Sequence, residues 1–446
     1  MTAALMVSVS GVRGIVGESL TPTVALEFAQ AYGRILGGGP VVLARDTRHG
    51  GPMLEAAALA GLLAAGCRVT RLGVAMTPTV GYAIRTGGYR GGVSITASHN
   101  PIEWNGLKFF DDLGVAPDPA RARELAELRT SAARTCTTAP VPPPSDDPSA
   151  GTRHAAAVRS AIEVDLTPLR GTRVVLDTIN GAGCLATPEL LESLGLEVVH
   201  LNGEPTGQFG HRPEPVRENL TALCDAVRRY GAAVGFAQDP DADRLALVDE
   251  HGEYIGEEYT LALSTWSVLS RRPGPVAVNL STSRLVDDVA ARFGVRVLRT
   301  PVGEAHVART MLAEQCVIGG EGNGGVIDPR ICYVRDSLSA ISLVLQLMAA
   351  TGWRLSQLVA DLPRYVQVKQ KYEAPRERID AAVAAVTRAF ADHQPNSADG
   401  VRVDLPEGWL HVRASNTEPI VRIIAEARSE AAAEALVARA KAAAGL

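Results

Sequence analysis

The sequence is short of several features, and each shortage excludes a class of protein. No apolar run approaches the roughly 20 residues that span a bilayer. The first eleven residues, MTAALMVSVSG, lack a basic segment followed by a long apolar one, so no secretory signal is expected. No CxxC pair occurs, and reduced thiols are expected at six scattered cysteines: Cys67, Cys136, Cys184, Cys224, Cys316 and Cys332. These absences predict a cytoplasmic protein.

A large excess of charge of one sign is also missing. The chain has 44 basic and 49 acidic residues and a formal net charge of −5. This balance gives no electrostatic reason to expect binding to nucleic acid or to an anionic membrane surface. With 46% hydrophobic and 21% charged residues, the composition is that of a soluble globular protein. Its 446 residues allow three or four domains, at roughly 100–200 residues each.

What the sequence does contain is one pattern that occurs three times. Residues 39–73, 171–201 and 274–300 each show a β-branched run, a polar loop, a helix-like apolar stretch, a glycine and a second run. Such a β-α-β unit needs a right-handed crossover and implies a mostly parallel sheet covered by helices. The three copies predict three related α/β domains with mixed, largely parallel sheets.

Breaks in composition predict where these domains end. The stretch TTAPVPPPSDDPSAG (137–151) is rich in Pro, Ser and Asp and has no apolar period, which favours a linker over a loop within one domain. The end of the chain shows a strand, a polar loop, a strand and an Ala-rich helix, typical of a small α+β domain. The predicted domains are residues 1–150, 151–252, 253–368 and 369–446.

The stretch ITASHNPIEWNGLKFF places polar residues after an apolar run that begins at Gly92. Ser98, His99 and Asn100 follow that run, and Pro101 prevents its continuation as a central strand. Loops at the carboxyl ends of parallel strands are where α/β domains bind ligands. The alternative is a turn whose side chains satisfy local backbone groups. A serine-hydrolase elbow, G-x-S-x-G, is absent.

A second polar stretch, AQDPDADRLALVD, alternates three aspartates: Asp239, Asp241 and Asp243. Carboxylates this close repel one another unless a cation lies among them, and their oxygens suit a hard divalent ion such as Mg²⁺. An EF-hand loop is excluded because Arg244 stands where that loop needs glycine. A solvated acidic turn is the alternative, which the apolar neighbours on both sides disfavour.

Two further stretches suit a phosphorylated sugar. GGEGNGG (319–325) is followed by a proline and β-type residues rather than a helix, so it does not fit a dinucleotide-binding loop. Its glycines indicate close approach to a ligand, and Glu321 and Asn323 suit sugar hydroxyls. RASNTEPIVR suits a phosphate, or else is a polar turn with a salt bridge to Glu418. Its candidate phosphate ligands are Arg413, Ser415, Asn416, Thr417 and Arg422.

Together these stretches resemble the α-D-phosphohexomutases, which move a phosphoryl group between C1 and C6 of a sugar. TASHNP resembles the family's phosphoserine loop, DPDADR its metal loop, GEGNGG its sugar-specificity loop and RASNTEPIVR its phosphate-binding loop. SGVRG, which contains Arg13, and HRPEP also fit, and all six matches are in family order. The resemblance implies three α/β domains and a C-terminal α+β domain around a central cleft.

The resemblance also implies a mechanism. Ser98 would be stored as a phosphoserine, pass its phosphoryl group to a hexose or hexosamine monophosphate, and regain the other phosphoryl group from the bisphosphate intermediate. One Mg²⁺ per chain, held by Asp239, Asp241, Asp243 and a phosphoserine oxygen, would neutralise charge. Glucose or glucosamine 1,6-bisphosphate would act as activator.

Other roles follow from the same resemblance. Ser98, Lys108, His99 and Arg13 form the implied catalytic set. Lys108 would be the general acid-base, with a pKa lowered by cationic neighbours, and His99 would support the serine loop. Arg13 and Arg244 would bind the transferring group. Glu321 and Asn323 would hold sugar hydroxyls, and the 413–422 loop would hold the phosphate that is not reacting.

Two departures from the family's patterns bear on the substrate. Bacterial phosphoglucosamine mutases usually read G-E-x-S-G-H in the sugar loop, whereas GEGNGG resembles the archaeal type and some broad-specificity mutases. Glucosamine phosphate is therefore the expected substrate, and a phosphomannomutase/phosphoglucomutase is the alternative. In GEAHV, Glu304 stands where many relatives have histidine, with His306 further on, so no auxiliary acid-base role is carried over to this loop.

Two other classes of protein are alternatives: a catalytically inactive binding protein and a metal-dependent phosphatase. The first would be expected to lack the serine, an aspartate or the lysine. The second would not need the sugar loop or the phosphate-binding loop. The expected assembly is a monomer or a homodimer.

Overall fold

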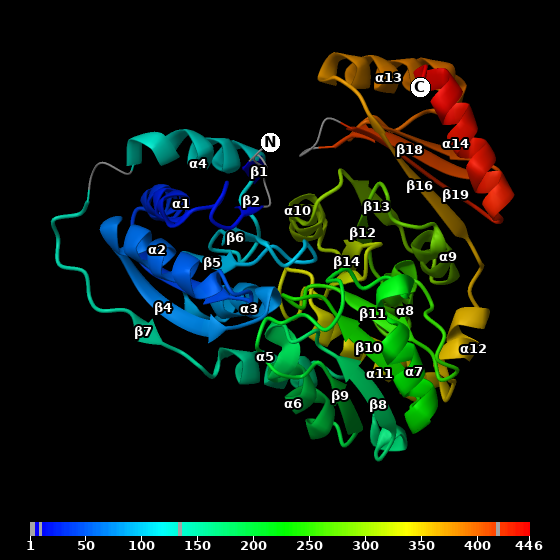
Figure 1. Ribbon diagram of the computed structural model, residues 1–446. Coiled ribbons are helices and arrows are strands. Elements are labelled where there is room, and N and C mark those ends of the chain that lie inside the picture. The colour runs from blue at the N-terminus through cyan, green and yellow to red at the C-terminus, as the bar shows by residue number, and fades with distance from the viewer. Residues whose placement is uncertain (1–4, 9–10, 133–135, 416–419) are drawn as a thin grey trace.

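The strands of the chain form four sheets, one for each of four domains that follow one another along the sequence (Figure 1). This computed structural model describes all residues except 1–4, 9–10, 133–135 and 416–419. Within that part of the chain, none of the helices combines the length and the apolar character of a membrane span. The prediction of three α/β domains followed by a C-terminal α+β domain is confirmed.

The first domain contains a sheet of seven strands in the order β1-β2-β6-β5-β3-β4-β7. Strands β3, β4, β5 and β7 run parallel, and β1, β2 and β6 form antiparallel pairs at the other side. Its elements are β1 (Met6–Ser8), β2 (Gly11–Ile15), α1 (Pro22–Ile35), β3 (Gly39–Arg45), α2 (Gly51–Ala64), β4 (Cys67–Val74), α3 (Thr77–Gly87), β5 (Gly91–Ile95), β6 (Trp104–Phe110), α4 (Pro119–Ala132) and β7 (Ser145–Asp146).

The second and third domains each contain a sheet of four strands with the same connectivity, in the orders β11-β10-β8-β9 and β15-β14-β12-β13. The second has α5 (Ala150–Ser160), β8 (Arg173–Asp177), α6 (Ala186–Ser193), β9 (Glu197–Leu201), α7 (Thr221–Tyr230), β10 (Val234–Gln238) and β11 (Leu245–Val248). The third has α8 (Glu257–Leu269), β12 (Val276–Asn279), α9 (Leu285–Arg292), β13 (Val297–Thr300), α10 (Glu304–Glu314), β14 (Ile318–Glu321), β15 (Gly325–Ile327), α11 (Ser337–Thr351) and α12 (Leu355–Ala360).

One four-strand unit is therefore repeated three times. Each unit has three parallel strands and a fourth, antiparallel strand beside the third: β3-β4-β5-β6, β8-β9-β10-β11 and β12-β13-β14-β15. The loop from the third strand to the fourth lies at the carboxyl end of a parallel strand, where α/β sheets bind ligands. In the three units that loop contains SHNP, DPDADR and GNG.

The C-terminal domain is built differently, with an antiparallel sheet in the order β16-β19-β18-β17. Its helices α13 and α14 cover the outer face of that sheet (Figure 1). The elements are β16 (Val366–Glu373), α13 (Arg376–Ala389), β17 (Val401–Leu405), β18 (Gly408–Ala414), β19 (Ile420–Ala427) and α14 (Glu430–Ala444).

Two parts of the chain differ from simple expectation. The Pro-rich linker is not without secondary structure, because β7 pairs in parallel with β4 and adds an edge strand to the first sheet. Strand β16 joins the C-terminal sheet and runs across the predicted limit at residue 368. The exact domain limits stay predictions.

Packing joins the first three domains into a continuous body. One apolar cluster extends from Phe236 in the second domain to Ile341 in the third, and another joins Met76 of the first domain to Leu338 of the third. The C-terminal domain has a core of its own. Burial of this apolar surface fixes the three sheets relative to one another, and with them the three loops at their ends.

A buried hydrogen-bond chain crosses the same junction. His154 of α5 contacts Thr79 of α3 through Nδ1 at 3.0 Å and Asp336 through Nε2 at 3.2 Å. Asp336 also caps α11, accepting from the backbone N–H groups of Leu338 and Ser339. Because buried polar groups need partners, these hydrogen bonds fix how the three domains are oriented as well as that they are in contact.

Polar contacts attach the C-terminal sheet to the third domain. The amide nitrogen of Gln367 donates to the carboxyl groups of Glu258 on α8 and Glu426 on β19, both at 3.0 Å. Ser281 and His411 form a further hydrogen bond at 2.9 Å. Burial raises the pKa of Glu258 to about 8, where Glu426 adds to the effect and Lys369 opposes it.

This buried carboxyl predicts a pH-dependent stability. Between pH about 4.5 and 8 the folded chain keeps a proton on Glu258 that the unfolded chain releases. The free energy of unfolding therefore falls as pH rises through this range, by up to about 1.4 kcal/mol per pH unit. Glu258→Gln, which cannot ionise, should flatten this part of the profile. Thermal unfolding at pH 5, 6.5 and 8 measures it.

The matched control is Glu197→Gln, since Glu197 forms an exposed pair with Arg173 and should leave the slope unchanged. An identical slope in the natural chain and in Glu258→Gln would contradict the prediction.

Candidate active site

Ser98 lies in the loop between β5 and β6 and is 1% exposed. Its φ is +51°, a left-handed conformation that non-glycine residues adopt at a cost and that often marks functional sites. The backbone N–H donates to Thr96 Oγ1 at 2.9 Å, and the hydroxyl donates to Asp239 Oδ2 at 2.7 Å. The predicted serine loop of the first domain therefore meets the predicted metal loop of the second.

Arg48 holds this loop in place, and it was not among the predicted site residues. The side chain is 1% exposed. Its Nη2 donates to the carbonyl oxygens of Ser98 and Asn100, both at 2.6 Å, and its Nη1 donates to those of Pro101 and Trp104 at 2.6 and 2.9 Å. Four bonds from one planar guanidinium fix the backbone around the serine.

Asp46 completes that clamp. Its Oδ2 accepts from Arg48 Nε at 3.2 Å and from Thr96 Oγ1 at 2.7 Å, and its Oδ1 accepts from the Arg48 backbone N–H at 2.9 Å. Both residues follow β3, at the same edge of the sheet as the serine loop. Their place after a parallel strand, in RDTRHG, was the signal that could have identified them.

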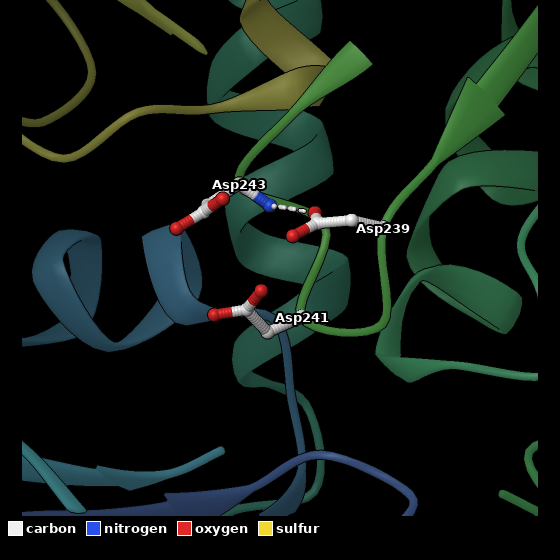
Figure 2. A group of neighbouring side chains, drawn as sticks. All are labelled: Asp239, Asp241 and Asp243. Carbon is white, nitrogen blue, oxygen red and sulfur yellow. Dashed lines mark hydrogen bonds between the residues drawn. The ribbon is translucent and has the colours of Figure 1, made fainter. Parts of the chain in front are cut away.

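The three aspartates of the second domain lie together between β10 and β11 (Figure 2). Each can offer one carboxylate oxygen such that all three oxygens lie within 4.8 Å of one another. Asp239 Oδ1 accepts from the backbone N–H groups of Asp243 and Arg244 at 3.0 and 3.1 Å. Ala242 has a φ of +54°, which turns the loop tightly enough to gather the side chains.

Residues of three domains surround this cluster. Lys108 of β6 donates to Asp241 at 2.7 Å and to Asp243 at 2.9 Å, and Arg335 donates to Asp243 at 2.6 Å. The Thr77 hydroxyl, at the start of α3, donates to Asp241 at 2.6 Å. Two cations of the first and third domains therefore balance acidic charge carried by the second.

The donor set fits a hard divalent cation. The three aspartates are all 0% exposed. Asp241 Oδ1 and Asp243 Oδ1 are buried and have no hydrogen-bond donor within the described residues. Buried carboxylate oxygens without donors are costly, and oxygen-only sites of this kind suit Mg²⁺. The geometry thus agrees with the metal site expected from the sequence.

Two carboxyl groups of the cluster have pKa values that are shifted in opposite directions. Burial, together with the charges of Asp243 and Asp241, raises the pKa of Asp239 well above its usual value. Burial also acts to raise the pKa of Asp243, but Arg335, Lys108 and Arg244 outweigh it and hold that pKa below its ordinary value. The surrounding cations therefore act more strongly on Asp243 than on Asp239.

Lys108 differs from expectation in its acidity. Burial acts to lower the pKa of Lys108, but the charges of Asp241 and Asp243 outweigh burial and raise it. The prediction that cationic neighbours lower this pKa is wrong for the structure described, since the charges of the two carboxylates outweigh that of Arg335. His99 is the contrasting case. The positive charge of Arg244, followed by burial, lowers its pKa well below the ordinary value and keeps the imidazole neutral.

The predicted sugar-specificity loop of the third domain begins at the end of β14. Glu321 is 5% exposed, and three donors hold its carboxylate. Asn279 and the backbone N–H of Gly303 donate to Oε1 at 2.8 and 3.1 Å, and Arg335 donates to Oε2 at 2.6 Å. The half-buried Asn323 has a side-chain oxygen without a hydrogen-bond partner among the described residues. Both polar side chains of this loop are thus present at the junction.

Gly324 of this loop packs against the protein's own backbone, and the expected approach of a ligand to the loop's glycines stays a prediction. Gly324 has a φ of +84°, and a Cβ there would lie 2.4 Å from the carbonyl oxygen of Leu245. The Leu245 N–H donates to the Gly324 carbonyl at 3.0 Å. Gly324 therefore lets the sugar loop pack against the backbone of β11, directly after the metal loop.

The remaining predicted residues fall into two groups. Arg13 donates to the Asn100 side chain at 3.2 Å, and Arg244 lies 3.9 Å from Glu214 of HRPEP, so both join the cluster around Ser98. Arg413 lies on β18, opposite Arg422 of β19, and donates to Asp399 at 2.9 Å.

The C-terminal loop is only partly described. The Ser415 N–H donates to the Ile420 carbonyl at 2.9 Å and closes that loop at its base. Asn416 and Thr417 lie outside the described residues. The strands on either side of the predicted phosphate-binding loop belong to a separate sheet, whereas the other three predicted loops meet at one place.

Comparison with known proteins gives a consistent result along the chain. Four consecutive segments match phosphoglucomutase/phosphomannomutase alpha/beta/alpha domains I, II and III and the C-terminal domain of the same proteins. They cover residues 5–134, 152–252, 257–365 and 365–443.

Individual relatives are similar over nearly their full length. The chain is 40% identical over 431 residues to a probable phosphoglucosamine mutase of Methanopyrus kandleri, covering 96% of this chain and 95% of the relative. It is 39% identical over 446 residues to a phosphoglucomutase/phosphomannomutase of Thermococcus kodakarensis, covering 94% of each. A phosphoglucomutase/phosphomannomutase family protein from Burkholderia thailandensis superposes with a TM-score of 0.85 at 29% identity, covering 99% and 98% of the two chains. The chain therefore belongs to the phosphoglucomutase/phosphomannomutase family, the α-D-phosphohexomutases, which are intramolecular phosphotransferases of the isomerase class.

Proposed function

We propose that this protein interconverts glucosamine 6-phosphate and glucosamine 1-phosphate through a phosphorylated Ser98. The observation that carries the proposal is the hydrogen bond of 2.7 Å from the Ser98 hydroxyl to Asp239, inside a buried cluster of three carboxylates that suits Mg²⁺. A hydroxyl that would accept the phosphoryl group thus lies against carboxylates that would hold a charge-neutralising cation, an arrangement that supports phosphoryl transfer.

The reaction is a pair of transfers in opposite directions. In the first, a hydroxyl oxygen of the sugar monophosphate attacks the phosphorus on Ser98. A new phosphorus–oxygen bond forms to the sugar, the bond to Ser98 Oγ breaks, and the hydroxyl proton leaves. In the second, Ser98 Oγ takes the other phosphoryl group from the sugar bisphosphate, and the sugar oxygen regains a proton. Atoms and charge balance over the two steps.

The side chains around Ser98 would have different roles in the two transfers. Lys108 would exchange the proton of the sugar hydroxyl, and its raised pKa makes the protonated amine, which donates to the leaving sugar oxygen, its resting form. Arg13 and Arg244 bind the transferring group, and neutral His99 supports the serine loop. Arg48 and Asp46 fix the loop backbone so that the attacking and leaving oxygens can lie in line with phosphorus.

One Mg²⁺ would be held by Asp239, Asp241, Asp243 and an oxygen of the Ser98 phosphoryl group. When bound, it supplies positive charge that offsets the charge developing on the phosphoryl oxygens. A sugar 1,6-bisphosphate would serve as activator by phosphorylating Ser98.

Glu321 and Asn323 would bind sugar hydroxyls. The carboxylate of Glu321 is fixed by three donors, so it presents an acceptor whose position does not depend on the ligand. The 413–422 loop would bind the phosphate that is not reacting. The sequence GEGNGG and the relatives called probable phosphoglucosamine mutase, 40% and 36% identical, support glucosamine as the sugar.

A phosphomannomutase/phosphoglucomutase is the second candidate. It is favoured by the 39% identical relative from Thermococcus kodakarensis, which is as similar to this chain as the amino-sugar relatives are. The two candidates share the nucleophile, the metal site and the chemistry, and they differ only in the contacts made to the 2-position of the sugar.

The test of the substrate is a ³¹P NMR time course with Mg²⁺ and a trace of sugar bisphosphate. Glucosamine 6-phosphate, glucose 1-phosphate and mannose 1-phosphate are offered separately. Conversion of glucosamine 6-phosphate to the 1-phosphate should be at least about tenfold faster than turnover of the others, a preference of roughly 1.4 kcal/mol in the transition state.

Equal or faster turnover of glucose or mannose phosphate would establish the second candidate instead. Release of inorganic phosphate alone would overturn the mutase proposal and leave a phosphatase. Ser98→Ala should show no turnover and no phosphorylation by the bisphosphate.

A second prediction concerns Asp241. Asp241→Asn removes one of the three charges that would hold Mg²⁺, so Mg²⁺ affinity should fall at least about tenfold, and turnover should fall about 100-fold or more. Calorimetry of metal binding and the NMR time course measure the two effects.

The matched control is Asp249→Asn, at the far end of β11. Asp249 accepts backbone hydrogen bonds from His251 and Glu253 in a tight turn, so its variant should keep metal affinity and turnover. Unchanged metal affinity in Asp241→Asn would remove this aspartate from the metal site.

A further inference from the structure

Arg335 lies between β15 and α11 and contacts three carboxylates from three separate segments. Its Nη2 donates to Asp243 at 2.6 Å and its Nη1 to Glu321 at 2.6 Å, while Nε lies 2.8 Å from Glu304. Asp243 belongs to the metal loop, Glu321 to the sugar loop, and Glu304 begins α10. The arginine is 7% exposed, so these contacts are largely shielded from water.

Each nitrogen of the guanidinium faces a different carboxylate. A planar fork with fixed angles can hold several acceptors in fixed relative positions, whereas an ammonium group acts as a point charge on a flexible stem. The charges of Asp243, Glu304 and Glu321 together raise the pKa of Arg335 well above its ordinary value, although burial acts to lower it. The side chain is therefore a permanent cation among three acidic groups.

The backbone next to Arg335 is fixed by hydrogen bonds that do not involve the Arg335 side chain. The next residue, Asp336, donates its N–H to the Val326 carbonyl at 2.7 Å and contacts the buried His154. Arg335 thus projects from an anchored segment, which allows its side chain to impose positions on its partners.

The Glu304 contact explains a departure seen in the sequence. Burial raises the pKa of Glu304, and the charge of Arg335 opposes this effect. An acidic residue at this position needs a buried cation beside it, and Arg335 provides one. Glu304 is therefore part of the same network as the metal and sugar loops.

We propose that Arg335 is a positioning residue that couples the metal loop to the sugar loop, holding Glu321 in place while it competes with the metal for Asp243. The sugar part of this inference rests on the proposed function. A divalent cation at Asp243 repels the guanidinium and weakens its bond to that carboxylate. The arginine then interacts more strongly with Glu321 and Glu304, so metal binding and sugar binding affect each other.

The test compares Arg335→Met, Arg335→Lys and the control Arg330→Met. Arg330 also pairs with two carboxylates, Asp328 and Glu163, at 22% side-chain exposure. The Kd for Mn²⁺ is measured by electron paramagnetic resonance, with and without glucosamine 6-phosphate. The KM and kcat for that sugar are measured separately, and circular dichroism reports folding.

Removal of the competing cation should tighten Mn²⁺ binding by Arg335→Met at least about threefold. Its KM should rise about tenfold, with a smaller change in kcat, because Glu321 loses a donor. The effect of sugar phosphate on the Kd for Mn²⁺ should disappear. Arg335→Lys keeps the charge, so its Kd for Mn²⁺ should stay near that of the natural chain while its KM still rises. Arg330→Met should match the natural chain in all three measurements.

A role in folding alone would weaken Mn²⁺ binding in Arg335→Met or leave it unchanged, and either outcome overturns the proposal. If Arg335→Met does not fold, an unchanged KM in Arg335→Lys overturns it. If the natural chain turns over no hexose or hexosamine phosphate, the proposed function fails. The Mn²⁺ measurements then still decide whether Arg335 competes for Asp243.

Discussion

Three carboxylates buried at the end of β10 are the constraint on which the arrangement of this protein depends. Burial of this acidic loop between the domains disfavours its charged carboxylates unless cations and hydrogen-bond donors face them. The groups that make burial tolerable come from elsewhere: Lys108, Thr77 and Ser98 from the first domain, and Arg335 from the third. Docking of the first and third domains against the second therefore also supplies the cations that neutralise its acidic loop. The site is complete only when the three domains are packed together.

Local sequence patterns were enough to predict the fold and most of the site loops. Alternation of β-branched runs with apolar helical stretches is a property of neighbouring residues, so the three repeated units could be read directly. The loops were visible because polar residues follow apolar strands abruptly, as at Ser98 and Asp239. A resemblance over six ordered motifs then related loops that no local pattern could connect.

The residues that sequence reasoning missed act through distant contacts. The place of Arg48 after a parallel strand could have marked it as a candidate, but neither its neighbours nor those of Arg335 indicate that one will bind four carbonyl groups and the other three carboxylates. The pKa of Lys108 was predicted in the wrong direction for the same reason. Its cationic neighbours were considered, but the position of its amine against Asp241 and Asp243 is decided by how β6 meets the second domain.

The repeated four-strand unit has an evolutionary consequence. The residues proposed as nucleophile, as metal ligands and as sugar ligands lie in or beside the same turn of a repeated unit, so each turn is anchored by its own pair of strands. Under the proposed function, substitution of Asn323 would alter sugar contacts and leave the serine and the aspartates in place, whereas Gly324 is constrained by its packing against Leu245, directly after the metal loop. The contacts of Arg335 set the limit to that modularity, because the glutamate preceding GNG shares its counter-ion with the metal loop. Selection on one turn must accommodate the other through this side chain and through the packing of Gly324 against Leu245.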